Sequence, residues 1–297
     1  MFFRGKIALR NDLQLYYKLK ESFMRKTILV ILTVLIMMLQ GTAAFGEKTD
    51  NKSLVLLGDS IASGYGLAEY KAGNNYSAPL SFGNMLGAEF ESYRNFAVDG
   101  RTSRQLLDAL ITPNEALKDA LSEADVIVIS IGGNDFLQPM ISAVKSAAMG
   151  DYELISAILK GEFKPGMLGE YSQRIMNAAL DAAKRVDVEQ TADNIERCVG
   201  LISKINPKAG IILMTVYDPF SGNALLKAVS DVAKDRLSSL NAGITALEGG
   251  NVKVIDVYKA FDGKAAEYTN INRLDIHPNV EGHNRIYELL EDVIGAL

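Results

Sequence analysis

Short apolar segments alternate with helical patterns along most of this chain, and this alternation constrains the fold more than any other feature. The apolar segments are bounded by turn residues and lie at 54–57, 91–98, 126–131, 210–216 and 252–257. Strands that alternate with helices build βαβ units, which place the strands in parallel with right-handed crossovers. The sequence therefore predicts an α/β fold with three layers, α/β/α, around a five-stranded parallel sheet of the flavodoxin-like kind.

Helical patterns occupy the intervals between these segments. The predicted helices cover 81–89, 103–120 with a break near Pro113, 187–205 and 281–296. The stretch 136–186 is longer than a crossover requires, and it has helix breaks at Gly150 and at Pro165-Gly166. Such an insertion forms either a helical lid over a site or an elaborated crossover that packs on the sheet, and the sequence allows both.

The N-terminus has the pattern of a secretory signal peptide. Arg25 and Lys26 precede an apolar run of 12 residues, Ile28–Leu39, and small residues follow the run at 41–44. A charged start, a short apolar centre and small residues before a cleavage point are typical of such peptides, and so short a run does not comfortably span a bilayer. We therefore predict export from the cytoplasm, with an uncleaved N-terminal anchor as the alternative.

Cleavage is predicted after Gly46, or else after Ala44. It divides the chain into a signal segment, 1–46, and one folded domain, 47–297, whose length suits a single α/β unit. Met24 directly precedes the charged pair of the signal segment, so the first 23 residues are interpreted as a misassigned N-terminal extension.

Charge and cysteine content restrict the partners and the compartment. The net charge is −5 for the whole chain, and residues 1–46 contribute +5 (seven Lys or Arg and two acids), so 47–297 carry −10. An acidic domain without basic runs argues against nucleic-acid binding. Cys198 is the only cysteine, which excludes an intramolecular disulfide. An exported protein without disulfides suits a bacterial envelope or culture fluid.

Polar motifs follow four of the predicted strands, beginning with Gly58-Asp59-Ser60-Ile61 after the first. In chain order, the candidate site residues in these motifs are Ser60, Gly100, Asn134, Asp275 and His277. Groups at the carboxyl ends of parallel strands meet in one crevice. A hydroxyl, a histidine, a carboxylate and amide donors are what acyl transfer requires. Each motif alone also suits a turn, and His283, the other histidine, is interpreted as a capping or surface group.

In this set of motifs the chain resembles the SGNH, or GDSL-type, hydrolases. Their blocks are Gly-Asp-Ser, a glycine block, Gly-x-Asn-Asp and a final Asp-x-x-His, and the match runs from Leu54 to the C-terminus. The segment 217–220, Tyr-Asp-Pro-Phe, also resembles a Tyr-Asn-Pro-Phe segment of bacterial GDSL-type lipases. The resemblance implies that Ser60 is the nucleophile and His277 the general base. It also implies an oxyanion hole made by the backbone N–H groups of Ser60 and Gly100 and the Asn134 side-chain amide.

The final block departs from the family pattern. The family places its acid three residues before the histidine, where this chain has Leu274, whereas Asp275 lies only two residues before His277. Either a tighter loop lets Asp275 reach the far ring nitrogen of His277, or a backbone carbonyl orients the imidazole. We adopt Asp275 as the acid of a Ser60–His277–Asp275 triad.

The sequence does not support other kinds of site. Ser60 lacks the Gly-x-Ser-x-Gly context of the α/β-hydrolases, and the glycine loop at 64–66 lacks both the dinucleotide fingerprint and a Walker lysine. No cluster of His, Cys and acidic residues has metal-ligand spacing, so we predict no metal and no cofactor.

These observations predict an exported serine esterase or lipase that hydrolyses carboxylic esters of small molecules or lipids. It is expected to touch membranes only through the signal segment or a lipid substrate. A deacetylase for O-acetylated carbohydrate or cell-wall polymer is the alternative on the same fold. A non-catalytic binding protein with a degenerate site is the alternative from another class, and only the altered aspartate spacing favours it.

Overall fold

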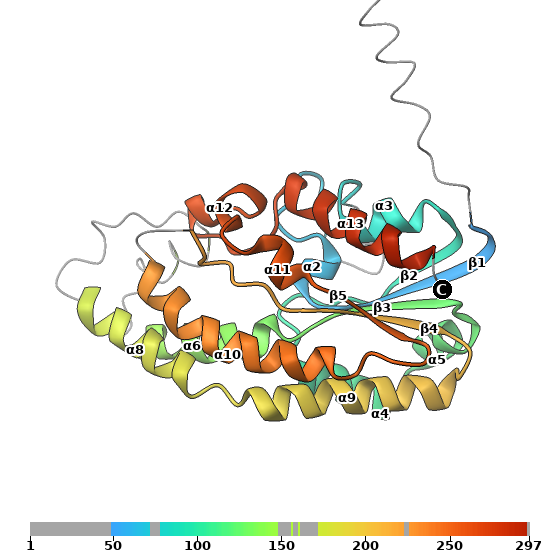
Figure 1. Ribbon diagram of the computed structural model, residues 1–297, viewed down its shortest axis with the longest axis horizontal. Helices are drawn as coiled ribbons and strands as arrows, with labels where there is room; N and C mark the ends of the chain where they lie inside the picture. The colour runs from blue at the N-terminus through green and yellow to red at the C-terminus, as the bar shows by residue number, and fades with distance from the viewer. Residues whose placement is uncertain are drawn as a thin grey trace, which may run out of the picture. The chain divides into compact units, whose positions relative to one another are not determined.

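A single parallel sheet organises the protein. The computed structural model describes residues 49–71, 78–147, 156, 160, 172–222 and 226–295. The five strands, all parallel, lie in the order β2-β1-β3-β4-β5 (Figure 1). They are β1 (Thr49–Gly58), β2 (Phe90–Asn95), β3 (Val126–Ser130), β4 (Gly210–Met214) and β5 (Val252–Ile255). This order is that of the flavodoxin-like sheet, so the predicted α/β fold and its five-stranded parallel sheet are confirmed.

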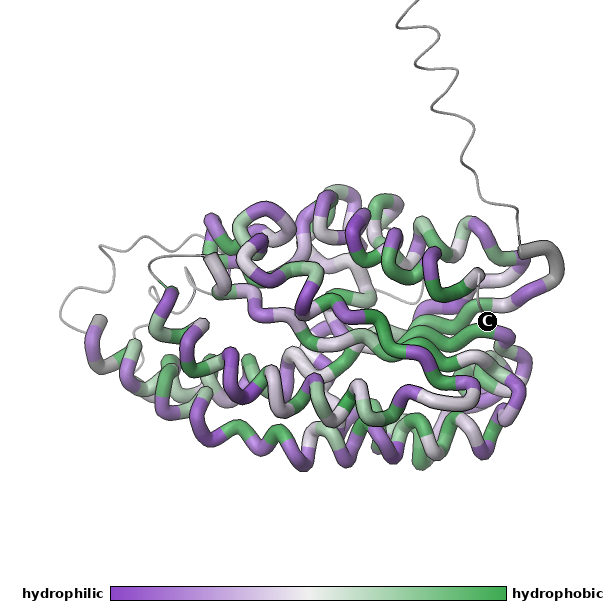
Figure 2. Tube along the Cα trace, in the orientation of Figure 1, coloured by the Kyte–Doolittle hydropathy of each residue, from purple (hydrophilic) through white to green (hydrophobic). Residues whose placement is uncertain are grey.

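Alternate residues of each strand point to opposite faces of the sheet, and each face has its own hydrophobic core. Leu54 and Leu56 of β1 belong to one cluster, and Val55 and Leu57 belong to the other. The register continues across the sheet, with Leu57 beside Ile129 of β3. Because both faces are covered, the three central strands read as nearly continuous apolar runs rather than as alternating patterns (Figure 2).

Helices cover both faces (Figure 1). The Leu54 face packs against α3 (Phe82–Gly87), α11 (Val257–Phe261) and α13 (Val280–Ile294), close to the short helices α2 (Ser60–Ser63) and α12 (Ala265–Tyr268). The Val55 face packs against α4 (Ser103–Ile111), α5 (Glu115–Glu123), α6 (Gly133–Ala147), α8 (Ser172–Lys184), α9 (Val188–Ile205) and α10 (Lys227–Thr245). The structure therefore has the three predicted layers.

The predicted helices are present, and local capping explains their ends. The break at Pro113 separates α4 from α5, whose N-cap Asn114 accepts the Leu117 N–H through its side chain at 2.9 Å. The α4 helix begins with a capping box between Thr102 and Gln105. Helix α10 was not predicted, because serine, aspartate and glycine interrupt its pattern. Its inward spacing of Val229, Ala233, Leu237, Leu240 and Ile244 is nevertheless helical.

Two regions with sequence predictions lie wholly or partly outside the described residues. The signal segment 1–46 is one of them, and 148–171, the centre of the 136–186 insertion, is the other apart from 156 and 160. The described ends of that insertion, α6 and α8, pack against each other and contribute buried side chains to the core on the Val55 face. Within the described part of the chain, no helix is long and apolar enough to cross a membrane.

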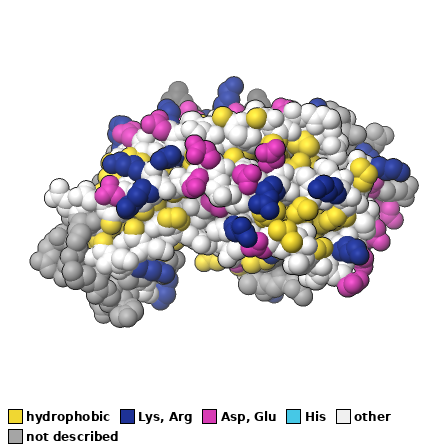
Figure 3. Space-filling model, turned by 90° about the horizontal axis from the view of Figure 1, so that it is seen from below, with side chains coloured by type: hydrophobic (Ala, Val, Ile, Leu, Met, Phe, Trp, Pro, Cys, Tyr) yellow, Lys and Arg dark blue, Asp and Glu magenta, His cyan; other side chains and the backbone are white. Residues whose placement is uncertain are grey.

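The helical face of the Val55 side is chemically mixed. Figure 3 shows lysine and arginine side chains on this face interspersed with acidic and apolar ones. Several of the charges pair along a helix, as Arg104 does with Asp108 and Lys227 with Asp231. Exposed pairs of this kind add little stability.

Candidate active site

The end of β1 presents Ser60. The chain leaves the strand at Gly58, where a Cβ would lie 2.3 Å from the carbonyl oxygen of Ser130, so the position requires glycine. Asp59 then caps α2, because its Oδ1 accepts the Ile61 N–H at 3.0 Å. Ser60 thus begins a single helical turn at the carboxyl edge of the sheet, where this fold class places its ligand sites.

The loop before α13 brings His277 to Ser60. Nε2 of His277 lies 2.9 Å from Oγ of Ser60, and Nδ1 lies 2.6 Å from Oδ1 of Asp275. The same carboxylate oxygen accepts the His277 backbone N–H at 3.0 Å. When Nδ1 carries the ring proton and donates it to Asp275, Nε2 can accept a proton from the Ser60 hydroxyl.

Asp275 is held in its ionised form by its neighbour. Burial alone would raise the pKa of Asp275, but the hydrogen bonds from His277 and the charge of that ring outweigh burial and hold the pKa below its ordinary value. A carboxylate in this state keeps the imidazole in one tautomer and stabilises the imidazolium that proton transfer creates.

A residue in the left-handed region brings Asp275 to the ring. Leu274 has φ 58° and ends the 3₁₀ turn Ile271–Arg273. Asn270 closes the loop, since its N–H donates to the His277 carbonyl at 3.0 Å and its carbonyl accepts the Asp275 N–H at 3.3 Å. The backbone turns at Leu274, so the carboxylate two residues before the histidine, and not the side chain three residues before it, lies beside Nδ1.

Gly100 lies on the wall of the same crevice, after β2. Its φ is 74°, and a Cβ built there would meet no atom within 4 Å. The glycine is therefore required for its backbone angle and not for space. Its carbonyl accepts a hydrogen bond of 2.6 Å from the Gln138 side chain of α6, which fixes the loop to that helix.

Asn134 lies in the first turn of α6, so the Gly-Gly-Asn-Asp motif starts a helix rather than only closing a turn. Its Nδ2 donates to the Arg101 carbonyl at 3.1 Å and to Oδ2 of Asp59 at 3.3 Å. The side chain is buried and lines the same cavity as Ser60. Its amide is thus held between the loop that follows β2 and the residue that precedes Ser60.

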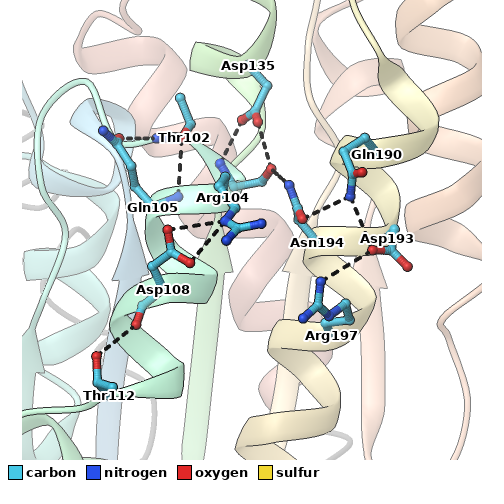
Figure 4. Close-up of polar contacts among 11 residues, drawn as sticks. Thr102, Arg104, Gln105, Asp108, Thr112, Asp135, Gln190, Asp193, Asn194 and Arg197 are labelled. Atoms are coloured by element: carbon cyan, nitrogen blue, oxygen red, sulfur yellow. Dashed lines mark hydrogen bonds and ion pairs between the residues drawn. The ribbon is translucent and has the colours of Figure 1, made fainter.

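A polar network anchors the start of α6 to the neighbouring helices (Figure 4). Asp135 accepts hydrogen bonds from the N–H and Oγ of Ser103 at 2.8 and 2.6 Å, at the start of α4. Asn194 of α9 donates to the same hydroxyl at 3.0 Å. Burial raises the pKa of Asp135, and the bonds from Ser103 oppose this. Two neighbouring helices, α4 directly and α9 through Ser103, therefore hold the residue next to Asn134, which limits movement of the asparagine.

Two cavities adjoin these groups. The larger has a volume of about 320 Å³ and is lined by Ser60, Tyr65, Asp99, Gly100, Asn134, Leu137, Ile141, Lys160, Leu274, Asp275, Ile276 and His277. The smaller, of about 40 Å³, has an almost wholly apolar wall formed by Ile61, Gly133, Phe136, Leu137, Val216, Tyr217, Pro219, Phe220, Ala233, Leu237 and Ile276. Leu137 and Ile276 line both, so the two cavities are neighbours. Among the described residues, no group of three His, Cys, Asp or Glu side chains could hold a metal ion.

Three residues near the site were not predicted from the sequence. The ring of Tyr65 lies 4.7 Å from the His277 ring, and the Tyr217 hydroxyl donates to the Ile276 carbonyl at 2.7 Å. Asp59 is buried next to the serine, and burial raises its pKa to about 7 against the hydrogen bond from Ile61 and the charge of His277. For Asp59 the position directly before Ser60 is a usable signal. For Tyr65 only closeness to the serine in the chain pointed to the site.

His283 is not a surface group, in contrast to one of the two roles predicted for it. It is fully buried, its ring stacks on Phe82, and its Nδ1 accepts the Phe82 N–H at 3.3 Å. It therefore caps the first turn of α3 rather than its own helix. Burial lowers the pKa of His283 to about 3, so the ring is neutral in the folded protein. The burial and the neutral state of His283 follow only from the packing of α13 against α3.

Stability should depend on pH through two buried groups of opposite sign. The folded-state pKa of His283, about 3, lies below its ordinary 6.5, so its contribution is lost as the pH falls from 6.5 towards 3. The folded-state pKa of Asp59, about 7, lies above its ordinary 3.8, so its contribution is lost as the pH rises from 3.8 to 7. Between about pH 4 and 6.5, the contribution of His283 makes the free energy of unfolding rise with pH, and the contribution of Asp59 makes it fall.

We expect Asp59→Asn to remove the Asp59 contribution to this pH dependence and to leave that of His283. Relative to wild type, the free energy of unfolding of the variant should then rise by up to about 1.4 kcal/mol per pH unit between about pH 4 and 6.5. Urea unfolding across this range measures the difference. If the free energy of unfolding changes with pH in the same way in the variant and the wild type, the assignment of a raised pKa to Asp59 is contradicted.

Comparisons with known proteins identify the family and the fold of the chain. The sequence model described as the GDSL-like lipase/acylhydrolase family matches residues 56–285. Spore germination lipase LipC of Bacillus licheniformis is 24% identical over 235 residues, which cover 79% of this chain and 92% of that protein. An extracellular lipase from Streptomyces rimosus has a TM-score of 0.57 at 17% identity, over 81% of this chain and 99% of that one. Phospholipase A1 from Streptomyces albidoflavus has a TM-score of 0.55 at 17% identity, over 81% and 98%. At these identities the solved structures establish the fold.

Proposed function

Because this chain belongs to the GDSL-like lipase/acylhydrolase family, we propose that it is a serine esterase whose catalytic triad is Ser60, His277 and Asp275. One observation carries the proposal. Ser60 Oγ, both ring nitrogens of His277 and Asp275 Oδ1 form a continuous hydrogen-bonded chain, with contacts of 2.9 and 2.6 Å, on the wall of the larger cavity. A nucleophile, a base and a group that orients the base are the three parts that acyl transfer needs.

The reaction proceeds in two halves. Ser60 Oγ attacks the ester carbonyl while His277 Nε2 takes the hydroxyl proton, which gives a tetrahedral intermediate and an imidazolium paired with Asp275. The C–O bond to the alcohol then breaks, and the imidazolium returns its proton to the departing oxygen. Water attacks the resulting acyl-enzyme, His277 takes a proton from it, and the carboxylic acid leaves as Ser60 recovers its hydrogen.

The negatively charged oxygen of the tetrahedral intermediate requires hydrogen-bond donors that point at it. We assign this role to the backbone N–H groups of Ser60 and Gly100 and to Asn134 Nδ2. The asparagine amide already donates to Arg101 and Asp59, so the substrate oxygen must share one of its N–H groups. Such bonds commonly tighten only when the transition state is bound.

Turnover of p-nitrophenyl esters together with covalent labelling by a fluorophosphonate tests this function. Active protein that is labelled at Ser60 supports it. Folded protein that neither turns over esters nor reacts with the probe would leave a binding protein as the better interpretation.

The smaller cavity supports an acyl subsite. Its wall is apolar and includes Ile61, which follows Ser60, while the larger cavity carries the charged side chains of Asp99 and Lys160. A hydrocarbon chain is more stable against the apolar wall, and the alcohol portion of the ester then lies in the larger space. A volume of about 40 Å³ holds roughly three water-sized groups, which corresponds to a short acyl chain such as butyryl.

Ala233→Leu should shorten the accepted acyl chain. Ala233 is buried in α10 and lines only the smaller cavity, so a leucine there fills the space. We expect kcat/KM for p-nitrophenyl butyrate to fall at least about tenfold relative to acetate, since the room for one methylene is worth about 10- to 200-fold. The acetate rate should change by less than about threefold, because an acetyl group needs little of this space.

Ala183→Leu is the matched control for this substitution. Ala183 is equally buried in α8 and packs into the same core, but it does not line the cavity. Both variants overpack the core at a cost of about 1–3 kcal/mol, so only Ala233→Leu should alter the acyl preference. An unchanged ratio of butyrate to acetate in folded Ala233→Leu would remove the acyl subsite from this cavity and leave the esterase assignment intact.

We also place the enzyme outside the cytoplasm. The support is the short apolar run Ile28–Leu39 between a charged pair and small residues. N-terminal sequencing of protein from the culture fluid and from the membrane fraction separates the two forms. A first residue near Glu47 indicates cleavage, and a product that retains the apolar run indicates an anchor.

A further inference from the structure

A buried carboxyl group that the proposed mechanism does not use joins two parts of the site. The Asp59 side chain is only 1% exposed and uses both of its oxygens. Oδ1 accepts the Ile61 N–H at 3.0 Å, within the turn that presents Ser60. Oδ2 accepts the Asn134 amide at 3.3 Å, from the first turn of α6. One side chain therefore connects the turn that carries Ser60, after β1, to the asparagine at the start of α6.

Helix capping alone does not account for a carboxyl group here. Serine or asparagine caps a helix as well as aspartate does, and neither places a charge in the interior. Among the described residues, the ionisable groups that interact electrostatically with Asp59 are His277 from the loop before α13, Asp135 from α6 and Tyr217 from the segment after β4. None of them is a lysine or arginine, so the carboxylate is only partly compensated, and retaining it costs stability.

We propose that Asp59 is a positioning residue of the ester-hydrolysing site, whose two carboxyl oxygens hold the Asn134 amide in register with the turn that carries Ser60. The inference rests on the proposed function, because it gives Asn134 a part in stabilising the oxyanion. A carboxylate suits this task because both of its oxygens only accept hydrogen bonds. Both facing groups, a backbone N–H and an amide N–H, are donors.

The isosteric change Asp59→Asn tests this role. Asparagine preserves shape and can still cap α2, but its amide has one acceptor oxygen and an NH₂ group, which cannot accept the second donor. We expect kcat to fall by about 10- to 100-fold, as for a small misplacement of a catalytic group. KM should stay within about threefold, since the loss falls on the transition state. Thermal stability above about pH 7 should be equal or higher, because a buried charge is removed.

The pH profile gives a readout that a merely structural role would not move. Burial raises the pKa of Asp59 to about 7, and a protonated carboxyl group, like an amide, has lost one of its two acceptor oxygens. The acid limb of log kcat/KM should therefore be steeper in the wild type than in Asp59→Asn, because only the wild type loses the second acceptor as the pH falls below about 7. The same slope in both proteins would overturn the inference.

A double-mutant cycle then tests whether Asp59 acts through Asn134. Asn134→Ala alone should cost about 10²- to 10³-fold in kcat, the usual effect of losing one oxyanion donor. In the Asn134→Ala background, Asp59→Asn should cost less than about threefold, because the group it positions is gone. Effects that multiply would show that the two residues act independently and would overturn the proposal.

Asp256→Asn is the matched control. Asp256 also follows a strand and caps a helix, with its side chain accepting the Lys259 N–H at 3.0 Å and the Thr215 hydroxyl at 3.1 Å, but it lines neither cavity. Its activity should match the wild type. Ser60→Ala, assayed in parallel, distinguishes failure of the proposed function from failure of the inference about Asp59. An active Ser60→Ala protein removes the proposed function, whereas an inactive one beside a fully active Asp59→Asn removes only this inference.

Discussion

Ser60→Ala should reduce ester hydrolysis by about 10⁶-fold, the loss seen when a serine hydrolase loses its nucleophile. The effect is so large because the His277 ring, 2.9 Å from Oγ, activates the Ser60 hydroxyl, and alanine leaves that ring without a hydroxyl to activate. The fold should survive, since the hydroxyl is lost from the first residue of a short helix and not from the apolar core. Initial rates with p-nitrophenyl acetate and butyrate, beside a thermal melt, measure both.

The control for this variant is Ser239→Ala, which removes a hydroxyl from the exposed side of α10. It should retain wild-type activity and fluorophosphonate labelling, whereas Ser60→Ala should lose both. Residual turnover near the wild-type rate in folded Ser60→Ala would mean that another group carries the chemistry, and the triad would have to be abandoned.

His277→Ala should be nearly as damaging as Ser60→Ala, and Asp275→Ala should be less damaging than either. Among the described residues, His277 is the base that is hydrogen-bonded to Oγ, so its removal leaves the hydroxyl unactivated. In the proposed triad Asp275 only orients the ring and stabilises its charge, through the contact of 2.6 Å to Nδ1. A misoriented imidazole costs up to about 10⁴-fold, and we expect a loss clearly above tenfold for Asp275→Ala. Single-turnover rates of the three alanine variants, measured together, give this order.

The variants at these positions also test the departure from the family pattern. Leu274→Ala tests the position three residues before His277, where the family places its acid and where this side chain lines the larger cavity. Any loss for Leu274→Ala should fall on KM, whereas the loss for Asp275→Ala should fall on kcat. A wild-type rate for Asp275→Ala together with an inactive His277→Ala would show a Ser–His dyad, in which a backbone carbonyl and not the carboxylate orients the histidine.

The sequence by itself was sufficient for the sheet, because its signals are local. Each strand is a short apolar run bounded by turn residues. Pro113 breaks the helical pattern of 103–120 by itself, whatever that part of the chain packs against. Parallel strands bring their carboxyl ends to one edge, so the order of the motifs sufficed to predict that Ser60, Gly100, Asn134 and His277 would lie in one crevice. Helix α10 was not predicted, because polar residues between its apolar positions make the helical spacing hard to recognise. That spacing becomes evident only from the side chains that the packed helix turns towards the sheet.

Tertiary structure decided what depends on groups distant in the chain. The acid beside His277 depends on a left-handed turn at Leu274, which is closed by bonds to Asn270 and is not marked by any glycine. His283 is a neutral core group only because α3 packs over it, 201 positions away in the chain. Asp59 has the pattern of a turn residue in the sequence, yet the fold buries it and hydrogen-bonds it to the Asn134 amide, 75 positions further along the chain. Burial, and with it every shifted pKa, is a property of packed neighbours that no local pattern contains.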